Sequence, residues 1–355
     1  MQGDILKLCG YHHAGSGPTH YIAVQASRIH LDGDCSANRD LPRAVIDGDS
    51  ERYSGISTGT SYGVTIEHIE VLNTTARGIY ASDSTGSMIV DRSIVIDSVY
   101  VHDIKKATTA VPTGIFSHGR NITIKNSVIA SIGDDGISHM GKGLVLQNVS
   151  ISNPGIASTT GDCVAASGEV DGLNINDLTC DHTNVDEKQC IVISNVTDAP
   201  HGTISNVNCM MPMGAKFMTG LTVHQGTWNI SGVYTRGGNI GMSFENSFGT
   251  ITATKNVVVG ATTACYRVEW NGLVSTSRTV LDGNVARLCG AFGVHVDNTS
   301  SGISVTRNVV KGAGRCLDIF YAGQAHSQNT LLDCSVSTTS ANKVAISNDP
   351  TTLSN

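Results

Sequence analysis

The chain has 355 residues and a net charge of −7, and its 40% hydrophobic residues are mainly aliphatic, since Phe, Trp and Tyr together reach only 5%. This composition is too apolar for an intrinsically disordered chain, yet no apolar run approaches the roughly 18 residues of a membrane span. No Lys/Arg cluster accompanies the acidic balance, so we expect neither nucleic acid nor a membrane as a partner.

A short pattern recurs from residue 54 almost to the C-terminus: a small residue, an aliphatic residue, any residue, and another apolar or small residue. Its aliphatic residue advances from Ile56 to Val344 in 11 steps, or about 26 residues per step. That spacing is too irregular for helical arrays and too short for propeller blades, which need about 40 residues. The pattern therefore predicts a solenoid of short strands joined by variable turns.

A second β-forming segment precedes each copy of the pattern, for example VTIEHIEV at 64–71 and ITIKNSVI at 122–129. Each segment alternates apolar and polar residues and is broken by Asn, Asp or Gly, which indicates two short strands that meet at a bend. Three strands per coil predict an all-β fold, a right-handed parallel β-helix (solenoid) of about twelve coils stacked about 4.8 Å apart. We expect one domain over 1–355, with a first coil or cap region at 1–50, regular coils at 51–348 and a polar tail at 349–355.

Two residue types have predicted structural roles from their place in the repeat. Asparagines at equivalent bends would hydrogen-bond to one another from coil to coil, and they are Asn126, Asn148, Asn206, Asn256, Asn284 and Asn308. The recurring pattern begins with Gly or Cys, and the cysteines are Cys163, Cys190, Cys265 and Cys316. We expect reduced thiols that replace glycine in a tight corner, with a Cys163–Cys190 pair as the alternative.

Three segments carry a resemblance to a known superfamily: GDILKLCGYHHAGSGPTHYIAVQASRIHLDGD at 3–34, GVTIEHIEVLN at 63–73 and RNITIKNSVIASIGDDGI at 120–137. They resemble the pectate-lyase-like β-helix superfamily, which includes pectin-degrading lyases, polygalacturonases and the tailspike depolymerases of bacteriophages. The resemblance implies a polysaccharide substrate, an extracellular or virion-associated location and, for the tailspike type, a homotrimer. The chain starts without the basic and apolar pattern of a secretion signal.

A first acidic cluster is expected where GDDG at 133–136 lies beside GDC at 161–163 of the next coil. In register, Asp135 stacks on Asp162 with Asp134 beside them, and carboxylates at that spacing shift their pKa values apart, as a catalytic acid and its partner require. The pair resembles the double aspartate of polygalacturonases, although the upstream NTD motif is missing and SHG at 117–119 precedes the pair. The alternatives are a Ca²⁺ site of three carboxylates, as in lyases, and an Asp-rich turn.

A second acidic cluster is expected further along the chain, where strand parity turns Glu245, Glu269 and Asp297 outward in three successive coils. The candidate binding residues around them are His224, Arg267, His295, Trp270 and Tyr321, the last two for stacking on sugar rings. Like charges on adjacent strands destabilise a sheet, so this ladder indicates a site, a bound cation or a partner subunit. The alternative is a solvent-exposed face on which Arg267 reduces the repulsion between the carboxylates.

Three further residues lie near the first cluster. His118 faces outward one coil earlier and is a candidate for substrate binding, and Lys142 is the nearby base if the reaction is a β-elimination. His139 aligns with inward positions, which predicts a packed core histidine. The histidine-rich segment YHHAGSGPTH at 11–20 has no spacing that defines a metal site.

Together these features predict a polysaccharide-degrading enzyme, a glycoside hydrolase that acts on a bacterial surface glycan or a pectin-like glycan through paired carboxylates. The catalytic candidates are Asp134, Asp135, Asp162, Glu245, Glu269 and Asp297. No cofactor is required, although Ca²⁺ remains open. The alternatives are a polysaccharide lyase that uses Ca²⁺ with a Lys or Arg base, and a non-catalytic glycan-binding adhesin or structural spike.

Overall fold

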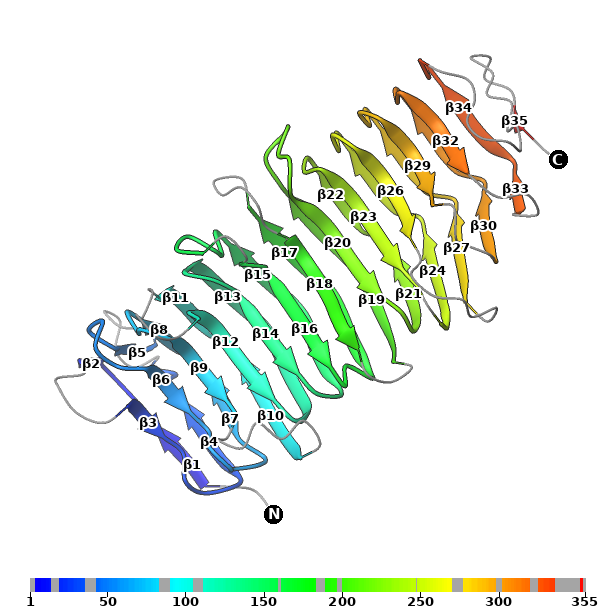
Figure 1. The fold of residues 1–355 in the computed structure, drawn as a ribbon. Helices are drawn as coiled ribbons and strands as arrows, with labels where there is room; N and C mark the ends of the chain where they lie inside the picture. The colour runs from blue at the N-terminus through cyan, green and yellow to red at the C-terminus, as the bar shows by residue number, and fades with distance from the viewer. Residues whose placement is uncertain are drawn as a thin grey trace. The chain divides into compact units, whose positions relative to one another are not determined.

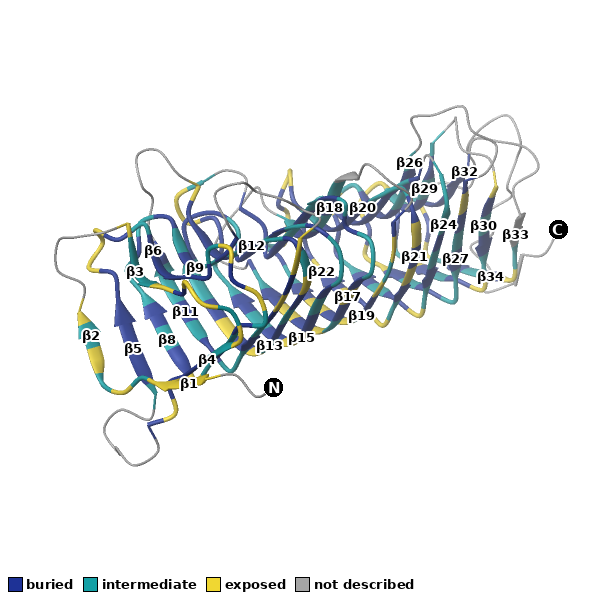
Figure 2. Cartoon of the chain, turned by 90° about the horizontal axis from the view of Figure 1, so that it is seen from below, coloured by how far each residue is buried: buried dark blue, intermediate teal, exposed yellow. Residues whose placement is uncertain are grey.

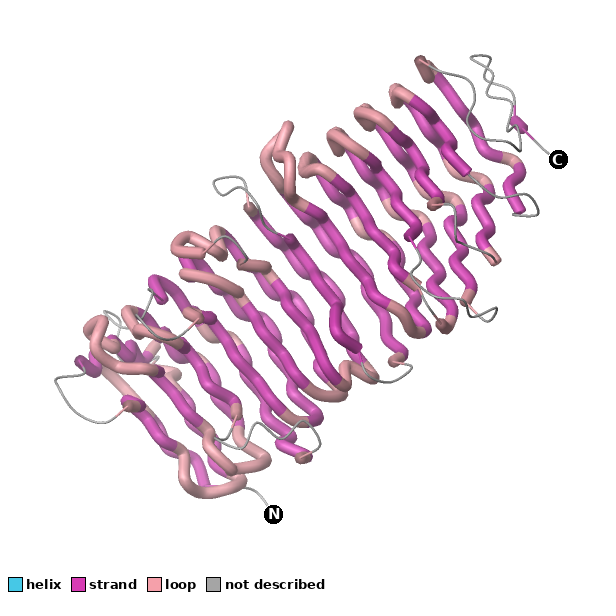
Figure 3. The backbone as a smooth tube through the Cα atoms, in the orientation of Figure 1, coloured by secondary structure: helices cyan, strands magenta, loops and turns pink. Residues whose placement is uncertain are grey.

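The described part of the chain consists of strands and turns, and no helix occurs in it (Figure 3). The computed structural model describes residues 4–13, 19–35, 43–82, 90–104, 111–158, 161–182, 189–196, 200–246, 248–269, 277–297, 302–319, 325–335 and 352–353. The chain divides into two compact units, Met1–Cys180 and Asp181–Asn355. Within the described ranges no helix is long and apolar enough to span a membrane.

In the first unit, the recurring pattern forms one parallel sheet, which we call the third-strand sheet (Figure 1). Its strands are β3 (His20–Ala23), β6 (Ser54–Ser57), β9 (Arg77–Ala81), β12 (Thr113–His118), β14 (Ile137–Met140) and β16 (Val164–Gly168). The aliphatic residue of each copy pairs with that of the next, from Ile56 through Ile79 and Ile115 to Ile137. These side chains are fully buried, so the repeat spacing predicted from the sequence is the spacing of the coils.

The second segments of the first unit form the bent sheet, which turns at a polar residue in each coil. Its strands are β1 (Asp4–Lys7), β2 (Tyr11–His13), β4 (Ile29–Asp32), β5 (Ala44–Asp47), β7 (Thr65–Glu67), β8 (Ile69–Leu72), β10 (Asp91–Asp97), β11 (Tyr100–Ile104), β13 (Arg120–Ile132), β15 (Leu144–Ser152) and β17 (Leu173–Asp181). They pair in parallel, as where Ile124 of β13 lies beside Leu146 of β15. Asn126 and Asn148 mark the bend with φ values of 50° and 52°.

The second unit repeats this architecture. Its third-strand sheet contains β18 (Gln189–Val196), β20 (Thr219–His224), β23 (Ile240–Glu245), β26 (Ala264–Glu269), β29 (Phe292–Val296) and β32 (Arg315–Ile319). Its bent sheet contains β19 (His201–Met210), β21 (Thr227–Ser231), β22 (Tyr234–Arg236), β24 (Thr250–Thr254), β25 (Val257–Val259), β27 (Arg278–Asp282), β28 (Val285–Arg287), β30 (Ile303–Thr306), β31 (Val309–Lys311), β33 (Ala325–Ser327), β34 (Asn329–Leu332) and β35 (Thr352–Leu353). The last of these, β35, pairs antiparallel with β34.

Each unit encloses a core of aliphatic side chains, because alternate residues of every strand point inward. In β24, for example, Ile251 and Ala253 are fully buried whereas the threonines between them are not. Figure 2 shows the same alternation of buried and less buried residues along the strands of both sheets. The all-β parallel β-helix predicted from the sequence is confirmed.

The asparagines predicted at equivalent bends in fact occupy two different positions. Asn126, Asn148 and Asn206 are themselves the left-handed bend residues, with φ between 50° and 53°. Buried asparagines of the second unit lie one position later, after bend residues such as Lys255 and Gly283. There the side chain of Asn256 donates to Oδ1 of Asn284 at 3.0 Å, Asn284 to Asn308 at 3.0 Å and Asn308 to Asn329 at 3.1 Å. The predicted hydrogen bonding from coil to coil is thus confirmed, but its most buried ladder is displaced by one residue.

The prediction of reduced thiols is wrong, because all ten cysteines form disulfides. The pairs are Cys9–Cys35, Cys163–Cys180, Cys190–Cys209, Cys265–Cys289 and Cys316–Cys334. The alternative Cys163–Cys190 pair is also wrong, since Cys163 bonds to Cys180 on the following strand of the bent sheet.

The corner that begins each third strand explains why glycine and cysteine alternate there. A Cβ atom added to Gly220 would lie 2.7 Å from the Cγ2 atom of Thr235, so the β-branched side chain already fills the space. Cys209 lies in register with Thr235, and its disulfide with Cys190 occupies the equivalent space in the preceding coil. Glycine with a β-branched neighbour and a cysteine pair are therefore two ways to fill one interior corner.

Candidate functional site

The second acidic cluster lies on the outer face of the third-strand sheet in the second unit. His224 of β20 pairs in register with Glu245 of β23, and Glu245 pairs with Glu269 of β26. The backbone N–H of Asp297 donates to the carbonyl of Val268 at 2.9 Å, so the ladder continues into the next coil. The predicted stacking of Glu245, Glu269 and Asp297 is confirmed, and we call these three residues the carboxylate ladder.

A second row of polar side chains runs beside the carboxylate ladder. Ser243, Arg267, His295 and Asp318 pair in register across β23, β26, β29 and β32. A guanidinium nitrogen of Arg267 lies 2.7 Å from Oε2 of Glu269, and its Nε donates to Oγ of Ser243 at 3.3 Å. The two rows are therefore joined by Arg267, which agrees with its predicted place beside the carboxylates.

Asp318, which was not among the predicted site residues, orients His295. Nδ1 of His295 lies 2.8 Å from Oδ2 of Asp318, and this carboxylate is almost fully buried. The imidazole of His295 also stacks on Phe292, with ring centroids 4.6 Å apart. The alternation of inward and outward residues already indicated this contact, because it places His295 and Asp318 on the same outward face in adjacent coils.

The electrostatics of the carboxylate ladder single out Glu269. Burial raises the pKa of Glu269, Arg267 lowers it, and the neighbouring carboxylates of Glu245 and Asp297 raise it again. The net direction is upward, so the protonated form persists to higher pH than for an ordinary glutamate. At the other side of the pair, Nε2 of His224 lies 3.2 Å from Oε2 of Glu245. The ladder thus combines a carboxyl group whose pKa is raised with a neighbour that faces an imidazole.

The first acidic cluster lies in the first unit, and its predicted register is also confirmed. Gly136 donates its backbone N–H to the carbonyl of Asp162 at 2.8 Å, which places Asp135 beside Asp162. However, Oδ1 of Asp135 accepts a hydrogen bond from the backbone N–H of Asp162 at 3.0 Å, and Asp134 and Asp162 are largely buried. Asp135 thus links its coil to the next one through a side-chain hydrogen bond to the backbone.

The residues predicted near this cluster have defined partners. His118 contacts Ser82 at 3.0 Å and the sulfur of Met140 at 2.7 Å. The Lys142 ammonium lies 3.5 Å from Oε2 of Glu169. His139 is fully buried, as predicted, and its Nδ1 lies 2.9 Å from Oγ of Ser117. Burial lowers the pKa of His139 to about 4, so this imidazole is neutral at physiological pH.

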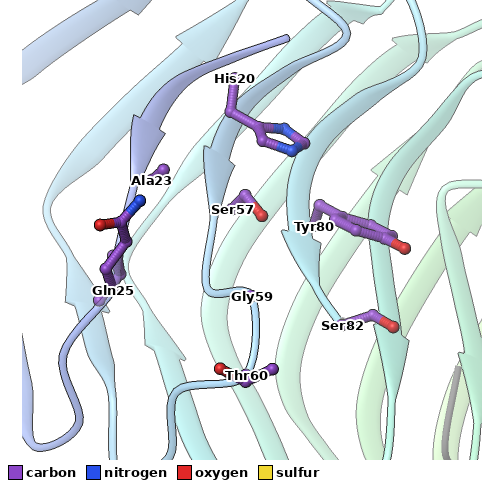
Figure 4. A pocket seen from close by; sticks show the side chains of 9 residues that line it. His20, Ala23, Gln25, Ser57, Gly59, Thr60, Tyr80 and Ser82 are labelled. Atoms are coloured by element: carbon purple, nitrogen blue, oxygen red, sulfur yellow. The ribbon is translucent and has the colours of Figure 1, made fainter. Parts of the chain in front are cut away.

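A pocket that the sequence reasoning missed opens on the third-strand sheet of the first unit (Figure 4). Its volume is about 390 Å³, and it is lined by His20, Ala23, Val24, Gln25, Ser57, Gly59, Thr60, Tyr80 and Ser82. Tyr80 stacks on His20 at 6.2 Å and on Phe116 at 5.6 Å between ring centroids. The available signal was the pair Tyr80 and Phe116, which follow the aliphatic residue in two successive copies of the pattern. Stacked rings beside hydroxyl and amide groups suit a carbohydrate ligand.

Two predicted stacking residues, Trp270 and Tyr321, lie outside the described residues. The remaining candidates separate by unit. His224, Glu245, Arg267, Glu269, His295 and Asp297 come together in the second unit. Asp134, Asp135, Asp162, His118 and Lys142 all belong to the first unit.

No protein-family model matches the chain, and no curated protein sequence does. Among solved structures, the A-module of an Azotobacter vinelandii mannuronan C-5 epimerase matches with 15% identity and a TM-score of 0.47, over 92% of this chain and 91% of that one. A double mutant of the tailspike protein of E. coli bacteriophage HK620 matches with 10% identity and a TM-score of 0.46, over 93% and 69%. An exopolygalacturonase from Thermotoga maritima matches with 10% identity and a TM-score of 0.41, over 78% and 83%. These matches share 15% identity or less with the chain, and the parallel β-helix is established by the strand pairing of the chain itself.

Proposed function

We propose that the protein is a polysaccharide-degrading enzyme, a glycoside hydrolase whose active site is the carboxylate ladder of the second unit. The observation that carries the proposal is the registered pair Glu245–Glu269, in which burial and neighbouring carboxylates raise the pKa of one member. A glycosidase needs this combination: one carboxylic acid protonates the leaving oxygen while the other carboxylate acts on the anomeric carbon or on water.

Within this proposal, Glu269 is the general acid, because its proton is retained to higher pH. Glu245 is the carboxylate that attacks the anomeric carbon, oriented by His224 at 3.2 Å. Adjacent coils are about 4.8 Å apart, close to the roughly 5 Å separation of the two carboxyl groups in retaining enzymes. Arg267 and the His295–Asp318 pair lie alongside and would bind substrate hydroxyl or carboxylate groups.

Two further observations support an extracellular polysaccharide as the substrate. Five disulfides persist in oxidising surroundings rather than in the reducing cytosol. In addition, the aromatic pocket of the first unit is lined by the stacked rings of His20 and Tyr80 and by hydroxyl groups, which carbohydrate binding uses. The proteins of similar fold named above include a polygalacturonase, a mannuronan epimerase and a phage tailspike, and capsular, pectic and alginate polymers are therefore the substrates to screen.

The test is incubation of the protein with a panel of capsular, pectic and alginate polysaccharides, with product masses and new reducing ends as readouts. Hydrolysis adds one water per cleaved bond, whereas a lyase gives unsaturated products. We expect Glu269→Gln and Glu245→Gln each to lower the rate by about 10² or more, and Glu70→Gln on the bent sheet to leave it unchanged. Loss of activity in Asp135→Asn or Asp162→Asn, with full activity in Glu269→Gln, would refute the assignment.

A second candidate function is glycan binding without cleavage, which the aromatic pocket by itself favours. In that case the polymers would be retained by the immobilised protein and would keep their original length on size-exclusion chromatography. Substitution of Tyr80 by Ala would then abolish retention, whereas Glu269→Gln would not affect it.

A further inference from the structure

Four side chains with metal-ligating atoms converge on the outer face of the bent sheet in the first unit. His30 and Asp32 alternate on β4 and so share one face. Asp32 lies in register with Glu67 at the end of β7, and His68 follows Glu67 directly. Two imidazoles and two carboxylates from consecutive coils therefore meet, on a sheet that the proposed hydrolase site does not use.

The distances between these side chains are those of a ligand set. Nε2 of His30 lies 2.5 Å from Oε1 of Glu67. Nδ1 of His68 lies 3.3 Å from Oδ1 of Asp32 and 3.9 Å from Oε1 of Glu67. One ligand atom each from His30, Asp32 and Glu67 lies within 4.8 Å of the other two. Donors bound tetrahedrally to Zn²⁺ at about 2.0 to 2.1 Å are separated by roughly 3.3 Å, and the contact distances of 2.5, 3.3 and 3.9 Å fall on both sides of that value. His30, Asp32 and Glu67 form the compact part of the set, and His68 adjoins it through Asp32 and Glu67.

The charges along this face leave an acidic centre. Lys7, Asp32, Glu67, Asp97 and Lys125 follow one another in register across five coils. Lys7 pairs with Asp32, and Lys125 lies 3.0 Å from Asp97. In the middle, the contacts described for Glu67 are to imidazoles alone, those of His30 and His68. Three stacked carboxylates between two lysines carry one negative charge in excess, which a bound cation would offset.

We propose that His30, Asp32, Glu67 and His68 form a site for a divalent first-row transition ion, with Zn²⁺ as the foremost candidate. Two imidazole nitrogens with two carboxylate oxygens suit Zn²⁺, whereas Ca²⁺ and Mg²⁺ prefer sets made of oxygen alone. Lys7 contacts Oδ2 of Asp32. Oδ1 of Asp32 faces His68 and also accepts the backbone N–H of Asp34 at 2.8 Å, which fixes the orientation of this carboxylate toward the other ligands. The His30 side chain is 29% exposed, so the ion enters from solvent.

A metal at this position would link β4 to β7. Each of these strands also pairs with a second neighbour, β4 with β1 and β7 with β10, so the ion would add to existing backbone hydrogen bonds. An ion that binds the folded coils and not the unfolded chain stabilises them in proportion to its affinity and concentration. The site is therefore a structural clamp, and it is independent of whether the protein cleaves a glycan.

The experiment uses the untagged full chain, with disulfides intact, after removal of metals by chelation. Titration with ZnCl₂ in a calorimeter is expected to show one equivalent bound, and CoCl₂ to give the visible absorption of a four-coordinate site. The thermal unfolding temperature should rise with ZnCl₂ and not with CaCl₂. His30→Ala and Glu67→Gln should weaken Zn²⁺ binding at least tenfold, and Lys7→Met should strengthen it, because Asp32 loses its competing ammonium.

The matched control is His102→Ala in the same unit. His102 also contacts two carboxylates, Glu70 at 3.1 Å and Asp103 at 2.7 Å, but it is the one imidazole described in that cluster. Its Zn²⁺ binding should equal that of the unchanged protein. Far-UV circular dichroism confirms that each variant is folded, and His30→Gln replaces His30→Ala if the latter is not. The proposal is overturned if no saturable Zn²⁺ binding occurs, or if His30 and Glu67 variants bind as tightly as the original chain.

Discussion

Glu269 lies in register beside Glu245, and the two side chains project from the same face of neighbouring coils. Repulsion between such carboxylates is costly in a sheet. The structure moderates it with Arg267, whose guanidinium is 2.7 Å from Glu269, and with His224, which is 3.2 Å from Glu245. The result is a pair of chemically identical groups in different electrostatic surroundings, which is what acid–base chemistry requires.

The first prediction concerns the pH dependence of glycan cleavage. Because Glu269 must be protonated to act as the acid, activity should fall as pH rises through its pKa. Removing the cation in Arg267→Met should raise that pKa further, since Arg267 lowers it, and should move the alkaline limb of the rate profile to higher pH. Glu245→Gln removes a neighbour that raises the pKa, so its residual activity should show the opposite displacement. Rates across a pH series measure both.

The control for this prediction is Arg287→Met, which removes an exposed arginine of β28. Its alkaline limb should coincide with that of the unchanged enzyme. An alkaline limb that stays in place in Arg267→Met would show that Glu269 is not the titrating acid.

The second prediction concerns acid stability and His139. Burial lowers its pKa from 6.5 to about 4, so the unfolded chain binds a proton more readily than the folded one between these values. The stabilisation is complete above pH 6.5 and is lost as pH falls toward 4. The difference between the pKa values of His139 in the unfolded and folded states corresponds to about 3 kcal/mol of unfolding free energy. Chemical denaturation of His139→Leu from pH 7.5 to 4 should show a correspondingly weaker loss of stability.

Carboxylates with lowered pKa values, such as Asp32 and Asp97, also destabilise the fold when they are protonated. They do so in both proteins, so only the difference between the two pH profiles reports His139. Equal profiles would contradict the interpretation.

The third prediction concerns the buried asparagine ladder. Oδ1 of Asn284 accepts hydrogen bonds from the backbone N–H and the side chain of Asn256, both at 3.0 Å. Asn284→Ala leaves these buried donors without their acceptor and should lower the free energy of unfolding by about 2 to 4 kcal/mol. Asn148→Gly removes an exposed amide that donates to Asn126 while tolerating the left-handed bend at this position, and it should cost about 1 kcal/mol or less. Urea denaturation compares them, and equal losses would refute the distinction between the two ladders.

The fourth prediction concerns the disulfides. Each closes a loop of about 20 residues, since the paired cysteines are 17 to 26 positions apart. Chain-entropy estimates give about 3 kcal/mol for a loop of this length. Reduction followed by alkylation should therefore lower the unfolding temperature strongly, as scanning calorimetry would detect. The control is alkylation without reduction, which should modify no cysteine; labelling of the unreduced protein would contradict the five bonds.

Much of the fold could be predicted because the repeat converts positions about 26 residues apart into neighbours. Period-two alternation assigned inward and outward faces correctly, as His139 and the carboxylate ladder show. The asparagines were harder to place, because a single sequence does not distinguish an asparagine at the bend itself from one that directly follows the bend. A shift of one position changes an exposed amide into a buried one.

The sequence by itself determined the coil period, the all-β class and which acidic residues stack, because a parallel sheet in register turns a linear repeat into distances. Only the tertiary structure decided the bonding state of the cysteines, since Cys163 meets Cys180 across an interior corner rather than along the stack. It also brought His30 and Glu67 together from different coils and formed the pocket beside Tyr80. The disulfide and the pocket depend on side-chain direction at corners and turns, which no periodicity encodes.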